Sequence, residues 1–310
     1  MDARTAVALS AVAYDPDIVR ALSGTLPTWR IVWIADKPVD DNMAFIARDP
    51  GGAYALAIRG TMMQFAAANV ANWIEDLDVL SQVSWPDGDQ ESKLSGGAYK
   101  GLTGLQALTD SRGGTPLSMR DYLIGRAHEE ALNLTITGHS LGGTLATVYA
   151  VWLHDELAAA SVNATLSVWT FAAPAAGNTS FAARYDALFG ASSYRCVMDF
   201  DVVPTFPVPD DMIAMMHTYV ASPASDDTLR LTGLSVREWA YGIKGTEWLH
   251  GSRYAQTNTP TGSIRVDDAA APKPPVTTLD AWLQTIASRH SVQNYVQAVA
   301  ALAPNAPLAP

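Results

Sequence analysis

Residues 134–143, LTITGHSLGG, place one serine between two glycines, an arrangement that can carry chemistry. Gly138 to Gly142 fit the pattern G-x-S-x-G, with Ser140 at its centre. An apolar β-like run precedes the pattern and a helix-like run follows it. So sharp a turn leaves no room for side chains beside the serine, which explains both glycines. The pattern therefore indicates a nucleophilic hydroxyl, whereas the alternative is a chance pentapeptide on a buried turn.

The predicted turn supports this chemistry in two ways. In α/β folds, sites lie at the carboxyl ends of the strands, where this serine would project. The N-terminus of the following helix offers free N–H groups to a developing oxyanion. A serine hydroxyl is a weak nucleophile, however, and needs a histidine base that a carboxylate orients.

Chain order limits the histidines that can act as this base. Where the serine occupies such a turn, the acid and then the histidine follow it along the chain. His128 and His139 precede Ser140, and His154 lies on the helix directly after it. Three candidates remain: His217, His250 and His290.

Position favours His290 among these three. It lies in SRHSVQNY, a break between two helix-like segments near the C-terminus, where a loop could bring an imidazole over the serine. His217 heads a β-like run, MHTYV, and His250 lies in a loop-rich stretch. Both stay open as alternatives.

Two aspartates are candidates for the orienting acid. The run VMDFDVVPTFP leaves a predicted strand and enters a proline-rich loop. Asp199 and Asp201 alternate, so on an extended chain they would share a face. Asp201 is nearer the loop, where a carboxylate could reach a histidine. A solvated turn aspartate is the alternative for either residue.

The elements around these residues predict an α/β fold. Three β-like runs, at residues 28–36, 43–49 and 53–60, are separated by turn residues and predict an antiparallel meander. From residue 118 to residue 201, helix-like and strand-like runs alternate, which favours a parallel sheet with crossover helices. Residues 278–302 predict a helix, a break and a second helix.

One stretch has a different composition. Residues 222–275 are rich in threonine, serine, glycine and proline, and predict an excursion of loops and short strands. No linker or internal repeat divides the chain, so we expect a single domain over residues 1–310. The composition, 48% hydrophobic and 16% charged, is enough for a large core.

Charge and cysteine content limit the partners. The formal net charge of −11 argues against a nucleic-acid partner, because phosphates would be repelled. The single cysteine, Cys196, allows no intrachain disulfide. No apolar run reaches the roughly 18 residues of a transmembrane helix. The N-terminal run is a poor signal peptide, so we expect a cytoplasmic location, with leaderless export as the alternative.

Several motifs in the same order resemble the class 3 lipases, the fungal-lipase-like branch of the α/β hydrolases. The resemblance implies an α/β-hydrolase fold, with a mixed, mostly parallel central sheet flanked by helices. The motifs are AIRGT (57–61), NWIEDLD (72–78), GGAYKGL (96–102), ITGHSLGGTLA (136–146), TFAAPAAGNTSFA (170–182), DFDVVPTFP (199–207) and RHSVQNYVQAV (289–299).

This resemblance also implies roles for individual residues. Ser140 would be the nucleophile, Asp201 the orienting acid and His290 the base. Thr61 and the N–H of Leu141 would form the oxyanion hole. A lid would follow directly at residues 62–77, although a core-facing helix is the alternative; its large apolar residues include Met62, Met63, Phe65 and Trp73.

The implied activity is a serine carboxylic-ester hydrolase that needs no metal or cofactor. Acylglycerols at an oil–water interface are the expected substrates. A feruloyl esterase, a phospholipase A1 and a non-catalytic binding module are the alternatives. Unlike the secreted fungal members, the chain shows no disulfide and no clear signal peptide, and residues 222–275 match no family motif.

Overall fold

The computed structural model describes residues 1–60, 78–86, 89–219, 227–259, 262–266 and 278–302. Thr61 and the lid candidates Met62, Met63, Phe65 and Trp73 lie outside the described residues.

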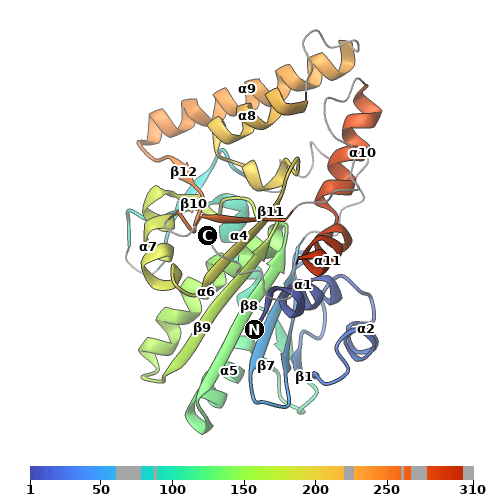
Figure 1. Cartoon of the computed structure of the whole chain (residues 1–310). Coiled ribbons are helices and arrows are strands. Elements are labelled where there is room, and N and C mark those ends of the chain that lie inside the picture. The colour runs from blue at the N-terminus through green and yellow to red at the C-terminus, as the bar shows by residue number, and fades with distance from the viewer. Residues whose placement is uncertain (61–77, 87–88, 220–226, 260–261, 267–277, 303–310) are drawn as a thin grey trace.

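A seven-stranded sheet in the order β1-β2-β3-β8-β9-β11-β13 forms the centre of the molecule (Figure 1). The first three strands are antiparallel neighbours, as the sequence predicts. The remaining strands run parallel to β3 and to one another. The strands are β1 (Arg30–Ile34), β2 (Met43–Arg48), β3 (Tyr54–Arg59), β8 (Leu132–His139), β9 (Ala164–Phe171), β11 (Ser193–Met198) and β13 (Ser263–Val266).

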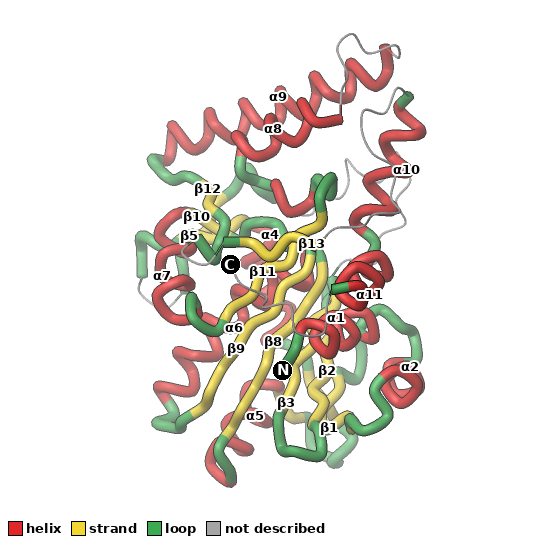
Figure 2. Tube along the Cα trace, in the orientation of Figure 1, coloured by secondary structure: helices red, strands yellow, loops and turns green. Residues whose placement is uncertain are grey.

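Helices cover both faces of this sheet, as the tube view shows (Figure 2). One face packs on α4 (Gly96–Gln106), α5 (Met119–Glu129), α6 (Leu141–Ala159) and α7 (Thr179–Phe189). The opposite face packs on α1 (Ala3–Val12), α2 (Ile18–Thr25) and α11 (Val292–Ala301).

The side chains of β3 show how the sequence produces these layers. Leu56 and Ile58 belong to the core under α4 to α7, whereas Ala55 and Ala57 belong to the core under α1 and α2. Successive residues of a strand point to opposite faces, so a strand covered on both sides is apolar at nearly every position. The predicted α/β class is therefore confirmed.

Smaller elements connect the layers. A four-stranded sheet in the order β12-β10-β5-β4 and a hairpin of β6 and β7 lie beside the central sheet. The smaller elements are β4 (Gln82–Ser84), β5 (Lys93–Ser95), β6 (Thr109–Asp110), β7 (Leu117–Ser118), β10 (Gly177–Asn178), β12 (Tyr254–Ala255), the 3-10 helix η1 (Val203–Thr205) and α10 (Leu279–His290).

None of the described helices is long and apolar enough to span a membrane.

The expectation for residues 222–275 is wrong over a long stretch. Helix α9 (Asp227–His250) occupies it and packs on α8 (Pro209–Tyr219), and this pair forms the top of the molecule in Figure 1. No proline interrupts the chain between Pro223 and Pro260, so a long helix is allowed. The average composition of the whole stretch concealed this. The short strands β12 and β13 follow, as predicted.

The same correction applies to two histidines. His217 lies within α8 rather than at the head of a β-strand. His250 is the last residue of α9 rather than part of a loop.

Candidate active site

Ser140 occupies a strained turn between β8 and α6. Its φ of 58° and ψ of −133° lie outside the regions that residues with a side chain normally adopt. A Cβ on Gly138 would lie 2.2 Å from the carbonyl oxygen of Gly142. A Cβ on Gly142 would lie 2.4 Å from the carbonyl oxygen of Ile58 on β3. Both glycines are therefore required by contacts between backbones.

Three side chains from distant parts of the chain meet at this turn. His290 Nε2 lies 2.7 Å from Ser140 Oγ. His290 Nδ1 lies 3.0 Å from Asp201 Oδ2, on the opposite side of the imidazole ring. The serine directly follows β8, the histidine ends α10 and the aspartate follows β11. The arrangement can transfer a proton from the hydroxyl to the imidazole while the carboxylate fixes the ring.

The triad is shielded from water. Ser140 is 7% exposed, His290 2% and Asp201 1%. A buried carboxylate is costly unless several donors surround it. Here the N–H of Val203 donates to Asp201 Oδ1 at 3.0 Å, in addition to the contact with the imidazole.

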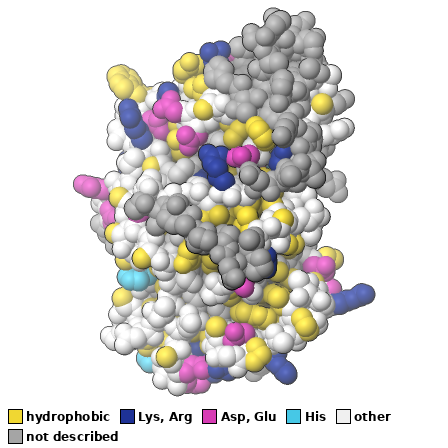
Figure 3. All heavy atoms as spheres, viewed as in Figure 1, with side chains coloured by type: hydrophobic (Ala, Val, Ile, Leu, Met, Phe, Trp, Pro, Cys, Tyr) yellow, Lys and Arg dark blue, Asp and Glu magenta, His cyan; other side chains and the backbone are white. Residues whose placement is uncertain are grey.

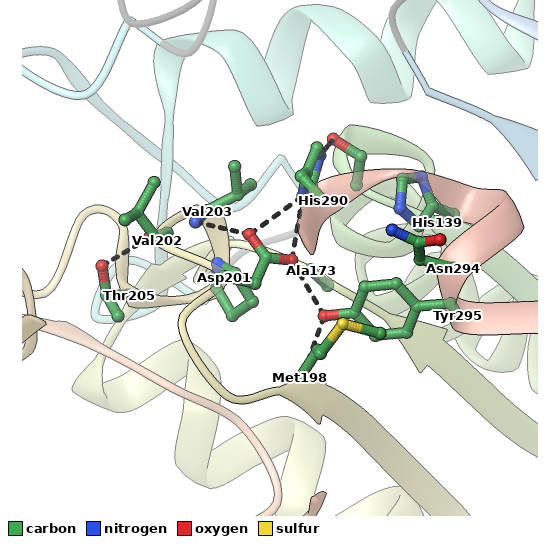
Figure 4. Close-up of polar contacts among 12 residues, drawn as sticks. His139, Ala173, Met198, Asp201, Val202, Val203, Thr205, His290, Asn294 and Tyr295 are labelled. Carbon is green, nitrogen blue, oxygen red and sulfur yellow. Dashed lines mark hydrogen bonds and ion pairs between the residues drawn. The ribbon is translucent and has the colours of Figure 1, made fainter. Parts of the chain in front are cut away.

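Tyr295 supplies a further donor to the acid. Its hydroxyl donates to Asp201 Oδ2 at 2.8 Å and accepts from the N–H of Met198 at 2.9 Å (Figure 4). Burial, together with the Asp201 carboxylate, raises the pKa of Tyr295 well above its usual value, so the hydroxyl keeps its proton. Tyr295 had no expected role from the sequence alone. The signal was present, since a buried carboxylate needs donors and the helix after His290 carries this tyrosine.

The chain turns at Phe200, between the two candidate acids Asp199 and Asp201. β11 ends at Met198, and Phe200 has a φ of 68°, so the chain turns instead of continuing extended. Asp201 points to His290, while Asp199 forms an ion pair with Arg265 on β13. The expectation that the two aspartates share a face is therefore wrong.

His139 lies beside the triad although chain order excluded it as the base. Its ring centroid is 4.8 Å from that of His290, and Tyr14 Oη is 3.2 Å from its Nδ1. Burial and the nearby His290 hold the pKa of His139 well below 6.5. A neutral ring at this position adds no positive charge next to the imidazole of His290.

The first turn of α6 and the end of β3 meet on one side of Ser140. Leu141 is the first residue of α6, so its N–H has no intrahelical acceptor and can face an anion. A Cβ on Gly60 would lie 2.8 Å from the carbonyl oxygen of His139 and 2.9 Å from the nitrogen of Gly142. The end of β3 thus packs directly on the serine turn, and Thr61 is the next residue along the chain. Within the described ranges, no cluster of three or more His, Cys, Asp or Glu could hold a metal ion.

The chain is similar to several known proteins. A profile of the class 3 lipases matches residues 55–211. Phospholipase A1-II 6 of Oryza sativa subsp. japonica is 29% identical over 226 residues, which cover 66% of this chain and 52% of that protein. A lipase of Caenorhabditis elegans is 42% identical over 224 residues, which cover 66% of this chain and 55% of the worm protein. The chain thus spans about half the length of these curated relatives.

One solved structure matches along almost the whole chain. The structure of M37 lipase superimposes with a TM-score of 0.76 at 23% identity, covering 96% of this chain and 94% of that one. At this identity the likeness shows the fold alone. It extends over α8 and α9 as well as the central sheet, because nearly the whole chain is covered.

Tyr295→Phe removes a hydroxyl while keeping the ring. We expect the rate at which a fluorophosphonate labels Ser140 to fall about tenfold, because Asp201 loses a buried hydrogen bond. Tyr194→Phe is the matched control, since Tyr194 stacks on Trp169 away from the triad. Equal labelling rates in the two variants would remove Tyr295 from any role in positioning the acid.

The pH dependence of stability tests the neutral state of His139. Below pH 6.5 the unfolded chain binds a proton at this histidine that the folded chain does not, so stability falls as the pH decreases. We expect His139→Gln to reduce the loss in unfolding free energy between pH 7.5 and pH 5.5 by about 1 kcal/mol in urea titrations. His128→Gln, at an exposed site on α5, should keep the wild-type loss. The same loss in both variants would contradict this prediction.

Proposed function

The chain belongs to the class 3 lipase family, and from this premise we propose that it hydrolyses carboxylic esters with Ser140 as nucleophile. His290 is the general base and Asp201 the orienting acid. The observation that carries the proposal is the continuous contact from Ser140 Oγ through His290 to Asp201, at 2.7 and 3.0 Å.

Each half of the reaction uses this contact. Ser140 Oγ attacks the ester carbonyl as His290 Nε2 takes its proton. The protonated His290 then gives this proton to the leaving alcohol, and an acyl-enzyme remains on Ser140. Water gives a proton to His290 as it attacks the acyl-enzyme, and the protonated His290 then returns this proton to Ser140 Oγ as the carboxylic acid leaves. No cofactor is required by these steps.

We propose that N–H groups next to the Ser140 turn stabilise the oxyanion. In the tetrahedral intermediate the former carbonyl oxygen carries a negative charge. We assign its stabilisation to the N–H of Leu141 at the start of α6 and to Thr61, which follows Gly60 at the end of β3. The close packing of Gly60 on the serine turn supports this assignment, because Thr61 is the next residue along the chain.

Acylglycerols are the substrates that we propose. The support is the family and the apolar composition of residues 62–77, which would form a lid that opens at an oil–water interface. A phospholipase A1 activity is the second candidate, because rice relatives carry that name.

Single substitutions in the triad test the proposed mechanism. Ser140→Ala, His290→Ala and Asp201→Asn should each lower kcat on p-nitrophenyl butyrate by about 10⁴-fold. Asp199→Asn is the matched control for the acid, and it should keep near wild-type kcat because Asp199 contacts Arg265 rather than the triad. Circular dichroism would verify that each variant is folded. A Ser140→Ala variant with full activity would refute the mechanism.

Substrate class is resolved by a comparison of four esters on the purified chain. We expect the highest kcat/KM on a triacylglycerol, with lower values for phosphatidylcholine, methyl ferulate and p-nitrophenyl butyrate. Activity on a partly soluble triacylglycerol should rise steeply once droplets form, if residues 62–77 act as a lid. Preference for the sn-1 ester of phosphatidylcholine would instead assign the phospholipase A1 activity, and preference for methyl ferulate an aryl esterase.

A further inference from the structure

Arg195 is a buried cation at the edge of a cavity that the ester-hydrolysis mechanism does not use. It lies on β11 and is 7% exposed. The cavity has a volume of about 580 Å³ and lies between β11, β13, η1 and the start of α8. Figure 3 shows basic and acidic side chains side by side near the middle of this face, between the helices at the top and the sheet below.

The contacts of Arg195 are all with neutral oxygens. Its guanidinium donates to Ser263 Oγ at 2.6 Å, to the carbonyl oxygen of Pro204 at 2.8 Å and to that of Ala173 at 3.4 Å. No carboxylate within the described part of the chain forms an ion pair with it. Burial lowers the pKa of Arg195 to about 10. A buried cation without an anion is costly, and a bound anion would offset that cost.

The carboxylates around the cavity do not fill this role. Asp199 is paired with Arg265, and Asp201 is held by His290 and Tyr295. Asp211, an exposed residue in the first turn of α8, lines the cavity and interacts with Arg195 only at longer range. The guanidinium thus has no contacting carboxylate among the described residues.

The lining suits a ligand that accepts hydrogen bonds. Ser263 uses its oxygen to accept from Arg195, so its hydroxyl proton is available to a ligand. Thr257 and Thr259 also line the cavity. Phosphate and carboxylate oxygens accept charge-assisted hydrogen bonds from a guanidinium N–H and hydrogen bonds from hydroxyl groups, so an oxyanion suits both kinds of donor.

We propose that this cavity binds a small oxyanion, a phosphate or carboxylate group, on the guanidinium of Arg195. Asp201 lines the cavity, whereas Ser140 and His290 do not, so the site lies behind the acid and away from the nucleophile. The oxyanion joins β11, β13 and the loop that carries Asp201. This inference stands whether or not the chain hydrolyses esters.

Thermal unfolding of the full chain tests the site. Sodium phosphate, sodium acetate and glycerol 3-phosphate are compared with sodium chloride at equal ionic strength and pH. A ligand that binds only the folded state raises the Tm as its concentration passes Kd. We expect phosphate or acetate to raise the Tm of the wild type above its value in chloride. The Tm of Arg195→Gln should be the same in these salts as in chloride. A larger Tm increase in glycerol 3-phosphate than in phosphate or acetate would indicate a lipid headgroup as the ligand. A larger increase in phosphate or acetate would indicate a free anion.

A matched pair of charge variants keeps the test valid if Arg195→Gln does not fold. Asp211→Asn removes the carboxylate that opposes an anion in the cavity, and should lower the Kd for phosphate by roughly threefold to tenfold in calorimetric titrations. Asp210→Asn makes the same change on the adjacent residue, which pairs with Lys244, and should leave the Kd nearly unchanged. Equal effects of the two variants, or Tm values in phosphate and in acetate that both equal the value in chloride, would overturn the proposal.

Discussion

The contact of three backbones at the serine turn is the constraint on which the rest of the site depends. β3, β8 and the first turn of α6 approach so closely that a Cβ on Gly60, Gly138 or Gly142 would lie less than 3.0 Å from a neighbouring backbone atom. This approach holds Ser140 at a positive φ and directs its hydroxyl out of the turn. It also brings the end of β3 beside the first N–H groups of α6. The position of Ser140 and that of the first N–H groups of α6 are thus fixed by one packing arrangement.

A second constraint, the burial of the Asp201 carboxylate, organises the opposite side of the triad. Its donors come from His290 at the end of α10, from Tyr295 on α11 and from the backbone of Val203. The hydroxyl of Tyr295 also accepts a hydrogen bond from the N–H of Met198, the last residue of β11. Because a buried charge needs every one of these donors, the C-terminal helices are tied to the loop after β11. The strain at Ser140 and the charge of Asp201 are supported by different elements.

Arg195 adds a third charged group to the interior at this edge of the sheet. It anchors the loop that follows Asp201 through the carbonyl oxygen of Pro204. Its hydrogen-bond partners are all neutral, whereas the donors around the carboxylate of Asp201 include the imidazole of His290. The loop after β11 therefore contacts both buried charged groups. Asp201 has several hydrogen-bond donors, and Arg195 is the group to which we assign a bound oxyanion.

The sequence by itself determined the fold class and the local structure at Ser140. Period-two and period-3.6 apolar patterns, together with glycines at fixed spacing, are local features, and they predicted the meander, the alternating strands and helices and the serine turn. The helix α9 was missed because its pattern was averaged with the proline-rich chain around it. Tertiary structure alone decided the partners. Whether Asp199 or Asp201 meets His290 depends on a turn at Phe200, and the roles of Tyr295 and Arg195 depend on contacts between segments far apart in sequence. A buried charge needs hydrogen-bond partners, and the fold brings these partners from segments far apart in sequence. A local sequence pattern therefore does not predict which residues they are.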